Sequence, residues 1–303
     1  MAKNLESAAE NEIIALRQQL EKHNYQYHVL DDPLISDAEY DRLFQRLIEL
    51  EAAHPQFAAP DSPTKKIGAP PLDKFRTVRH TVPMLSLSNA NDQKDLAEFE
   101  ERIVRFLRST DTIEYFVEPK IDGVAVELVY VDGRFTVGST RGDGINGEDI
   151  TLNLKTIRSI PLVLRAGARP APERLEVRGE VFLSRAAFQR MNREREDAGQ
   201  LVFANPRNPA AGSLNPLDST LTANRPLDVF FHGTGVVAGA SLASHAEFRA
   251  AIQDWGLKPV PFARLCRGIE DILKLRDEME SRRDELPYEI DGLVIKVNLH
   301  ELQ

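Results

Sequence analysis

A lysine between two carboxylates is the feature of this sequence best suited to covalent chemistry. The segment Glu118-Pro119-Lys120-Ile121-Asp122-Gly123 opens an alternating apolar run that starts at Val124. Because side chains alternate across a strand, Glu118, Lys120 and Asp122 are expected on one face, at the mouth of the core. A lysine amine acts as a nucleophile only when it is deprotonated and held in place, and these neighbours could position it.

The same segment has a second, structural interpretation. Adjacent carboxylates raise the pKa of a lysine, whereas burial and neighbouring cations lower it, so the sequence leaves the protonation state of Lys120 open. A surface strand in which Glu118, Lys120 and Asp122 form a ladder of ion pairs would have the same pattern. The other motifs of the chain are needed to decide whether Lys120 is a nucleophile or a member of such a ladder.

A second strand with a lysine is predicted over residues 290–297. Strict alternation would place Asp291 and Lys296 on opposite faces. Both can serve one site only if Gly292 introduces a bulge or a bend. Lys296 could equally be a residue that protects an exposed strand edge.

A glycine-rich loop over residues 140–147 formally contains the pattern G-x-G-x-x-G. A dinucleotide fingerprint of this kind must follow the first strand of a βαβ unit, and an acidic residue should come about twenty positions later. Here the preceding strand belongs to a hairpin, and the later position falls in Gly167-Ala168-Arg169, so we reject the Rossmann interpretation. A tight turn that lets Arg141 approach a phosphate and a plain surface turn are both compatible with the loop.

Two carboxylates four residues apart, Asp37 and Asp41, flank Tyr40 close to Tyr27 and His28. Like charges at this spacing repel, although the first turn of a helix favours carboxylates. The functional alternative is a pocket for an aromatic cation, with carboxylates for the charge and tyrosine rings for cation-π contact. The nicotinamide ring of NAD is such a cation.

The first 70 residues are predicted to form a helical hairpin. An apolar stripe from Ile13 to Tyr27 has helical spacing and stops near Pro33, and a capping box of Ser36 and Glu39 begins a second helix. Prolines then predict an irregular linker over residues 54–83. We therefore expect a small helical domain over 1–70 and a larger domain over 71–303.

Strands dominate the second domain. Residues 124–131 and 134–140 flank Asp132-Gly133, a pair suited to a type I′ turn, and residues 175–183 alternate between an apolar and a charged face. A short strand around Phe230 and a helix from Ser244 to Trp255 follow. These elements predict an α+β fold with an antiparallel sheet and not a doubly wound one.

Composition limits the functional classes. The 303 residues carry a net charge of -9, yet residues 155–207 hold eleven basic and six acidic side chains, so a local basic surface can still meet phosphates. The single cysteine, Cys266, excludes internal disulfides and a cysteine-rich zinc site within these residues. No apolar run has the length of a membrane span and no signal peptide is evident, so we expect a cytoplasmic, monomeric protein without membrane contact.

Together these segments resemble the N-terminal half of bacterial NAD-dependent DNA ligases, which belong to the covalent nucleotidyltransferase superfamily. The resemblance covers nearly the whole chain. A lone K-x-D-G is a weak signal, whereas a set of blocks in a fixed order is specific. The blocks are Tyr27-His28 with residues 37–41, and then residues 83–87, 118–123, 140–144, 176–180, 203–213 and 290–296.

The resemblance implies a reaction. Lys120 would attack the α-phosphate of NAD with the help of Mg²⁺, form a lysyl-AMP phosphoramidate and release nicotinamide mononucleotide. The AMP would then activate a DNA 5′-phosphate, and a 3′-hydroxyl would displace it to seal a nick. Nicked duplex DNA would thus be the partner of the full-length protein.

The resemblance also implies residue roles. The catalytic residues would be Lys120, Asp122, Asp291 and Lys296. The AMP half of NAD would be held by Ser86, Leu87, Glu118, Arg141, Glu180, His232 and Lys296. The nicotinamide half would be held by Tyr27, His28, Asp37, Ala38, Glu39, Tyr40 and Asp41. DNA would be contacted by Arg207 and Arg283.

Three positions depart from the family pattern. Asn215 stands where the family usually has an arginine, which removes one expected DNA phosphate contact, and His232 stands where it has an adenine-stacking tyrosine. The sequence ends at Gln303, before the last nucleotidyltransferase lysine and the DNA-wrapping domains of the family. We therefore expect an adenylation fragment that binds NAD, adenylates itself incompletely and does not seal nicks efficiently alone.

Two other functions share parts of this pattern. An ATP-dependent ligase or a capping-type nucleotidyltransferase would use the lysine motif but not the module around Tyr40. A non-catalytic NAD-binding module would keep the binding residues without the chemistry of Lys120.

Overall fold

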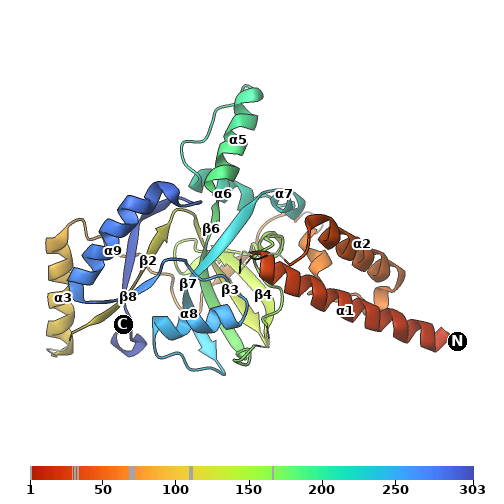
Figure 1. Ribbon diagram of the computed structural model, residues 1–303, viewed down its shortest axis with the longest axis horizontal. Helices are drawn as coiled ribbons and strands as arrows, with labels where there is room; N and C mark the ends of the chain where they lie inside the picture. The colour runs from red at the N-terminus through yellow and green to blue at the C-terminus, as the bar shows by residue number, and fades with distance from the viewer. Residues whose placement is uncertain are drawn as a thin grey trace.

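Two antiparallel sheets form the body of the chain, and a helical hairpin lies at one end of it (Figure 1). The computed structural model describes residues 2–28, 30, 32, 34–67, 72–108, 112–165 and 167–303. Within these residues, every pairing between named strands is antiparallel. The predicted α+β class is therefore confirmed.

Helices and strands are interspersed along the chain. The α-helices are α1 (Ala2–His28), α2 (Asp37–Ala53), α3 (Gln93–Leu107), α4 (Thr151–Lys155), α5 (Arg185–Asp197), α6 (Arg207–Leu214), α7 (Ser219–Ala223), α8 (His245–Asp254) and α9 (Gly268–Arg282). The short 3-10 helices are η1 (Pro55–Phe57), η2 (Pro63–Ile67), η3 (Arg283–Glu285) and η4 (His300–Leu302). The strands are β1 (Thr77–Arg79), β2 (Glu114–Ile121), β3 (Val124–Val131), β4 (Arg134–Thr140), β5 (Asn146–Glu148), β6 (Arg174–Leu183), β7 (Leu227–Ala238), β8 (Arg264–Arg267) and β9 (Ile290–Val297).

The hairpin of α1 and α2 has a small core of its own. Ile13 and Leu20 of α1 are buried against Leu47 of α2, as the helical spacing predicts. The predicted capping box is present: the Ser36 hydroxyl accepts a bond from the Glu39 backbone N–H, and the Glu39 carboxylate accepts one from the Ser36 N–H. These bonds satisfy backbone groups that the first turn of a helix leaves free.

The larger core lies between the four-stranded sheet, in the order β4-β3-β6-β7, and the helices α4, α6 and α8. The β3–β4 hairpin turns at Asp132 and Gly133, whose φ angles of 47° and 75° are those of the predicted type I′ turn. Leu175 and Val177 on the apolar face of β6 are fully buried. Alternation alone therefore predicts which face of this strand enters the core.

A second core joins the three-stranded sheet, in the order β8-β2-β9, to α3 and α9. The side chains of Phe182 in β6 and Phe230 in β7 extend from the four-stranded sheet into this core, with ring centroids 4.8 Å apart. Tyr288 packs edge-on against both rings, at 5.6 Å and 5.2 Å. The two sheets are thus joined through three aromatic rings, which prefer such edge-to-face contacts.

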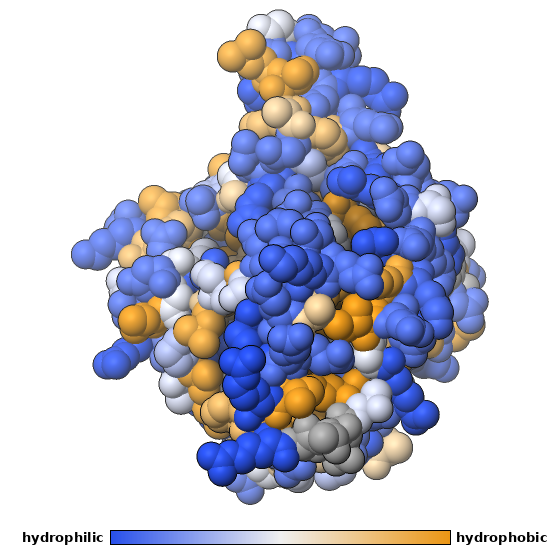
Figure 2. Space-filling model, turned by 90° about the vertical axis from the view of Figure 1, so that its left-hand side faces the viewer, coloured by the Kyte–Doolittle hydropathy of each residue, from blue (hydrophilic) through white to orange (hydrophobic). Residues whose placement is uncertain are grey.

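The surface over α3 and α9 is mainly hydrophilic, with apolar atoms gathered in recesses (Figure 2). A groove between α3, α9 and β9 accounts for part of this apolar surface and is lined by Leu96, Ile272, Met279, Leu293 and Ile295. The helix α5 projects away from the body (Figure 1). In the loop that follows α5, the Leu201 side chain is 89% exposed.

Three segments differ from the predictions. The stretch 54–83 is not irregular throughout, since it contains η1, η2 and β1. The strand around Phe230 is not short, because β7 has twelve residues. Residues 207–214, where the sequence is rich in turn formers, fold as α6. Pro206 and Pro209 fall at the N-cap and in the first turn, where a missing N–H removes no intrahelical bond.

The capping box gives a test of the hairpin. Replacing Ser36→Ala removes the side-chain bond to the first turn of α2 and should lower the free energy of unfolding of the hairpin by about 1 kcal/mol. Thermal unfolding followed by helical circular dichroism measures this loss. Ser7→Ala on the exposed face of α1 is the control and should not destabilise the hairpin. Equal losses in both variants would contradict the capping role.

Candidate active site

Lys120 lies at the end of β2, and its ammonium group bonds the Asp291 carboxylate of β9 at 2.8 Å. The pairing of β2 with β9 changes register between Pro119 and Ile121, and Gly292 opposite has a φ of +119°, a conformation that favours glycine. The irregularity predicted at Gly292 is therefore present. In a regular strand, Asp291 and Lys296 would point to opposite faces, because they are five positions apart. The irregularity lets Asp291 reach Lys120 while Lys296 reaches Glu118.

The alternative interpretation, in which Glu118, Lys120 and Asp122 pair with one another, is not what the structure shows. Glu118 pairs with Lys296, at 2.5 Å, and Asp122 lies 3.8 Å from the Arg207 guanidinium of α6. Each carboxylate that flanks Lys120 in sequence is thus engaged by a cation from a distant segment. The Lys120 side chain itself is 38% exposed, so it stays accessible to a ligand.

Glu118 is a buried carboxylate of β2, 4% exposed. Burial raises the pKa of Glu118, and the adjacent Lys296 and Arg249 oppose that rise. Lys296 also donates to the carbonyl of His232 at 2.6 Å, which fixes its amine between β2 and β7. The structure therefore brings together Glu118, Lys296 and His232, three of the residues assigned to the AMP half of NAD.

His232 itself is held neutral. Burial, together with the positive charges of Lys296 and Arg178, lowers the pKa of the His232 imidazole to about 3. A neutral ring can stack on a purine without adding a charge to the site. The departure from tyrosine at this position thus keeps an uncharged planar side chain.

Glu180 of β6 lies close to the lysine motif. Burial raises the pKa of Glu180 to about 7, while the charges of Arg207 and Lys120 oppose the rise. The backbone N–H of Gly123 bonds this carboxylate, and a Cβ at Gly123 would overlap the carbonyl oxygen of Val181. The glycine of the motif is therefore required by close approach of β3 to β6.

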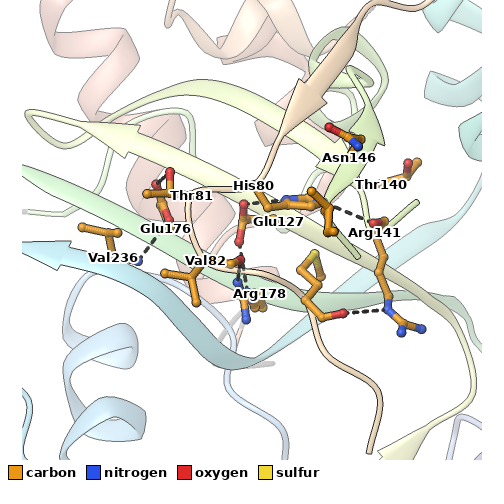
Figure 3. A network of polar contacts seen from close by, with 12 residues as sticks. His80, Thr81, Val82, Glu127, Thr140, Arg141, Asn146, Glu176, Arg178 and Val236 are labelled. Atoms are coloured by element: carbon orange, nitrogen blue, oxygen red, sulfur yellow. Dashed lines mark hydrogen bonds and ion pairs between the residues drawn. The ribbon is translucent and has the colours of Figure 1, made fainter. Parts of the chain in front are cut away.

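A buried polar network anchors the segment before Ser86 to the four-stranded sheet (Figure 3). His80 bonds Glu127 of β3 at 2.8 Å, and Glu127 accepts a second bond from Arg178 of β6 at 3.0 Å. Arg178 also donates to the carbonyl of Val82. Since buried charges are costly unless paired, these bonds hold residues 80–82 in one place.

A second branch of the network uses Glu176, which is fully buried on the charged face of β6. Its carboxylate accepts bonds from the Thr81 hydroxyl at 2.7 Å and from the Val236 backbone at 3.0 Å. The alternating pattern predicts the position of Glu176 on that face but does not predict its burial. His80 and Glu127 were missed altogether, because the sequence gives no sign that the segment at 80 covers β3.

Arg141 joins this network to the glycine-rich loop. Its carbonyl accepts a bond from His80, and its guanidinium donates to the Met84 carbonyl at 3.1 Å and to the Ser86 hydroxyl at 2.6 Å. Gly142 follows with a φ of +54°, which confirms a tight turn. The structure therefore brings Arg141 and Ser86 together, beside Leu87, which is 59% exposed.

The residues assigned to nicotinamide lie in and between α1 and α2. The Tyr40 hydroxyl donates to Asn24 at 2.9 Å, and burial raises the pKa of Tyr40. Glu39 serves the capping box, whereas Ala38 and Asp41 are exposed. Tyr27 is half exposed, and the side chains of His28 and Asp37 lie outside the described residues. The described contact of Tyr40 leads to α1 and not to Lys120.

Arg283 donates to the carbonyl of Ile290 at 3.1 Å, and Arg185 of α5 donates to the carbonyl of Arg283 at 3.0 Å. The pKa of Asp291 is lowered by its bond from Lys120 and, to a smaller extent, by the positive charges of Arg207 and Arg283. In the part of the chain that the structure describes, no group of three His, Cys, Asp or Glu side chains could hold a metal ion. None of the described helices is long and apolar enough to cross a membrane.

The buried network predicts a stability effect. Replacing Glu127→Gln leaves Arg178 and His80 without their shared carboxylate and should lower the free energy of unfolding by about 3 kcal/mol. The single tryptophan, Trp255, is buried in the core on the other face of the same sheet and reports urea unfolding by fluorescence. The matched control is Glu148→Gln on the exposed edge of β5. Equal midpoints for both variants would refute the anchoring role.

Glu180 predicts a pH dependence. Its folded pKa of about 7 lies above the ordinary value of 4.5, so the folded chain binds more protons between these pH values, and its stability falls as pH rises through them. Glu180→Gln should remove this fall and gain at most about 3 kcal/mol over the native chain by pH 7. Urea unfolding at a series of pH values measures the difference, which should vanish below pH 4. A gain that is the same at every pH would count against burial of an ionisable carboxylate.

Comparison with known proteins gives two family matches that together cover most of the chain. Residues 6–68 match the family described as DNA ligase-like, N-terminal NAD⁺-binding domain, and residues 72–303 match the NAD-dependent DNA ligase adenylation domain. A DNA ligase of Geobacter sulfurreducens is 54% identical over 297 residues, and one of Geobacter metallireducens is 52% identical over 299 residues. These matches cover 97% and 98% of this chain and 44% of each relative.

The chain thus spans less than half the length of these relatives. Among solved structures it is similar to one titled "Pmar-Lig_Pre.", with 14% identity and a TM-score of 0.36, over 85% of this chain and 49% of that one. That likeness is too low to support an argument. The family matches, by contrast, cover almost every residue: the chain belongs to the NAD-dependent DNA ligases and comprises their N-terminal NAD⁺-binding domain and their adenylation domain.

Proposed function

We propose that Lys120 of this chain attacks the α-phosphate of NAD, forms lysyl-AMP and releases nicotinamide mononucleotide. The observation that carries the proposal is the partly exposed Lys120 amine, which is fixed by Asp291 at 2.8 Å beside the buried pair of Glu118 and Lys296. An amine held in one position loses less entropy when it meets a bound phosphate.

The reaction requires a change of partner at Lys120. Before its nitrogen can bond phosphorus, the Lys120 side chain must give up a proton, and water at this partly exposed side chain can accept it. The N–P bond then forms while the bond from the α-phosphorus to the oxygen that links the two nucleotides breaks, and that oxygen leaves with nicotinamide mononucleotide. Asp291 therefore orients the lysine in the resting state and has to release it for attack.

Positive side chains support the charge that develops on the phosphate. Arg141 and Lys296 each have a fixed position, Arg141 through Met84 and Ser86 and Lys296 through Glu118. Fixed cations stabilise a phosphoryl transition state without having to reorganise. We assign the adenosine contacts to Ser86, Leu87, Glu118, Glu180 and His232.

We propose that Mg²⁺ enters the site together with NAD, bound to its phosphates. Because the described residues contain no cluster of three metal-ligating side chains, a protein cage for Mg²⁺ does not fit this site. Mg²⁺ commonly binds through substrate phosphates and water with only one or two carboxylates. Mg²⁺ bound to NAD would neutralise phosphate charge, and no step above depends on a ligand to it from this chain.

The remaining assignments rest on the family. We propose that residues 1–70 bind the nicotinamide half through Tyr27, His28, Asp37, Ala38, Glu39, Tyr40 and Asp41, and that residues 71–303 bind the AMP half. In the full-length protein, AMP would pass to a nicked DNA duplex contacted by Arg207 and Arg283. We further propose a cytoplasmic monomer.

Mass spectrometry of the intact chain tests the nucleophile. After incubation with NAD and Mg²⁺, the native chain should gain the mass of one AMP, and Lys120→Ala should gain none because the attacking nitrogen is absent. Lys94→Ala, on the exposed surface of α3, is the control and should react as the native chain does.

The same assay separates the other functions. An adduct formed from ATP and not from NAD would overturn the assignment of NAD. An AMP adduct that persists in Lys120→Ala would overturn the role of Lys120. NAD binding without any adduct in the native chain would favour a non-catalytic binding module.

A further inference from the structure

A cavity lies between the helical hairpin and the adenylation domain, away from Lys120. The hairpin side contributes Glu21, Asn24, Tyr25, Asp61 and Lys66, and the other side contributes Arg158, Ser159, Arg165 and Gly256. Its volume is about 40 Å³. That is room for about three water molecules or one small ion, and too little for a nucleoside.

Three of the lining residues are cations. Lys66 donates to the carbonyls of Arg158 and Ile160, both at 2.8 Å, so its position is fixed and one of its three N–H donors remains. Arg165 lies over the ring of Tyr25, with its guanidinium carbon 3.7 Å from the ring centroid. The cavity therefore collects positive charge from both sides of the interface.

Two acidic residues, Glu21 and Asp61, line the cavity beside the three cations. Asp61 forms an ion pair with Arg134, outside the cavity lining. Burial raises the pKa of Glu21, and the nearby Lys66 opposes that rise. Burial also lowers the pKa of Lys66 to about 8, an effect that Glu21 opposes and Arg158 reinforces. Glu21 is thus a counter-charge for Lys66, while Arg158 and Arg165 add further positive charge to the lining.

A second observation points to a polar ligand. The Ser159 hydroxyl is buried, its residue is 5% exposed, and the hydroxyl has no hydrogen-bond partner. Such a group is destabilising unless something bonds it. At Gly256, whose φ is +87°, a Cβ would lie 3.0 Å from two carbons of the Arg165 side chain. The glycine therefore lets the backbone approach the Arg165 stem closely.

We propose that this cavity binds a small phosphate-class oxyanion through the Lys66 ammonium, the Arg158 guanidinium and the Ser159 hydroxyl. Because Lys66 comes from the N-terminal segment and the other two from the adenylation domain, the bound anion ties the two parts of the chain together. Guanidinium groups suit tetrahedral oxyanions, since they offer several donors in a fixed geometry. The site is separate from the nucleotide contacts assigned above.

Isothermal titration calorimetry with inorganic phosphate tests the site. All chains carry Lys120→Ala, so that no adenylation occurs, and sodium chloride keeps the ionic strength constant. We expect one saturable event that Arg158→Gln weakens at least about tenfold and Ser159→Ala weakens about fivefold. Lys65→Gln, next to Lys66 but exposed and outside the cavity, is the control and should bind phosphate as the parent does.

Two outcomes would overturn the proposal. One is the absence of saturable phosphate binding in a chain whose thermal unfolding shows that it is folded. The other is binding that survives both Arg158→Gln and Ser159→Ala, which would place the phosphate elsewhere, for instance at Arg141. Since the titration uses chains that cannot be adenylated, its failure leaves the role of Lys120 untouched, and failure of adenylation leaves the titration unaffected.

Discussion

The proposed site depends on ion pairs that join charged side chains from segments far apart in the sequence. Lys120 has carboxylates on both sides in sequence, yet it bonds Asp291, 171 residues away, while Lys296 and Arg207 engage Glu118 and Asp122. Pairing within the motif would tie the amine to its own strand. Pairing across β2 and β9 instead makes the position of the amine a property of the folded sheet, so the chemistry of the lysine requires the β9 bulge.

A second set of buried charges fixes the segment that leads to Ser86. Glu127 and Glu176 lie inside the protein because His80, Thr81 and Arg178 satisfy them. A hydrophobic contact would hold this segment less specifically, since apolar side chains can slide over one another, whereas hydrogen bonds have defined directions. Ser86 and Arg141 therefore derive their positions from buried residues outside the proposed nucleotide contacts.

Local patterns predicted most of the fold. The capping box at Ser36, the turn at Asp132 and the bulge at Gly292 depend on neighbouring residues, and each was predicted from the sequence. The network around Glu127 and the partner of Lys120 could not be predicted in the same way, because they join segments far apart in the chain. The motif predicts which residues take part in the proposed site, but it does not predict which charge pairs with which. The sequence does not predict that α6 begins at Arg207, because proline is common both in turns and in the first turn of a helix.

The three aromatic rings between the sheets have a further consequence. The Phe182 and Phe230 rings extend from the four-stranded sheet, and the Tyr288 ring comes from the segment before β9. Because these rings are closely packed, they restrict the angle between the two sheets. Lys120 and Asp291 lie in the three-stranded sheet, and Glu180 lies in the four-stranded sheet. The proposed catalytic residues are thus divided between two sheets. A substitution that loosens the packing of the three rings, remote from Lys120, would shift both groups of residues relative to each other.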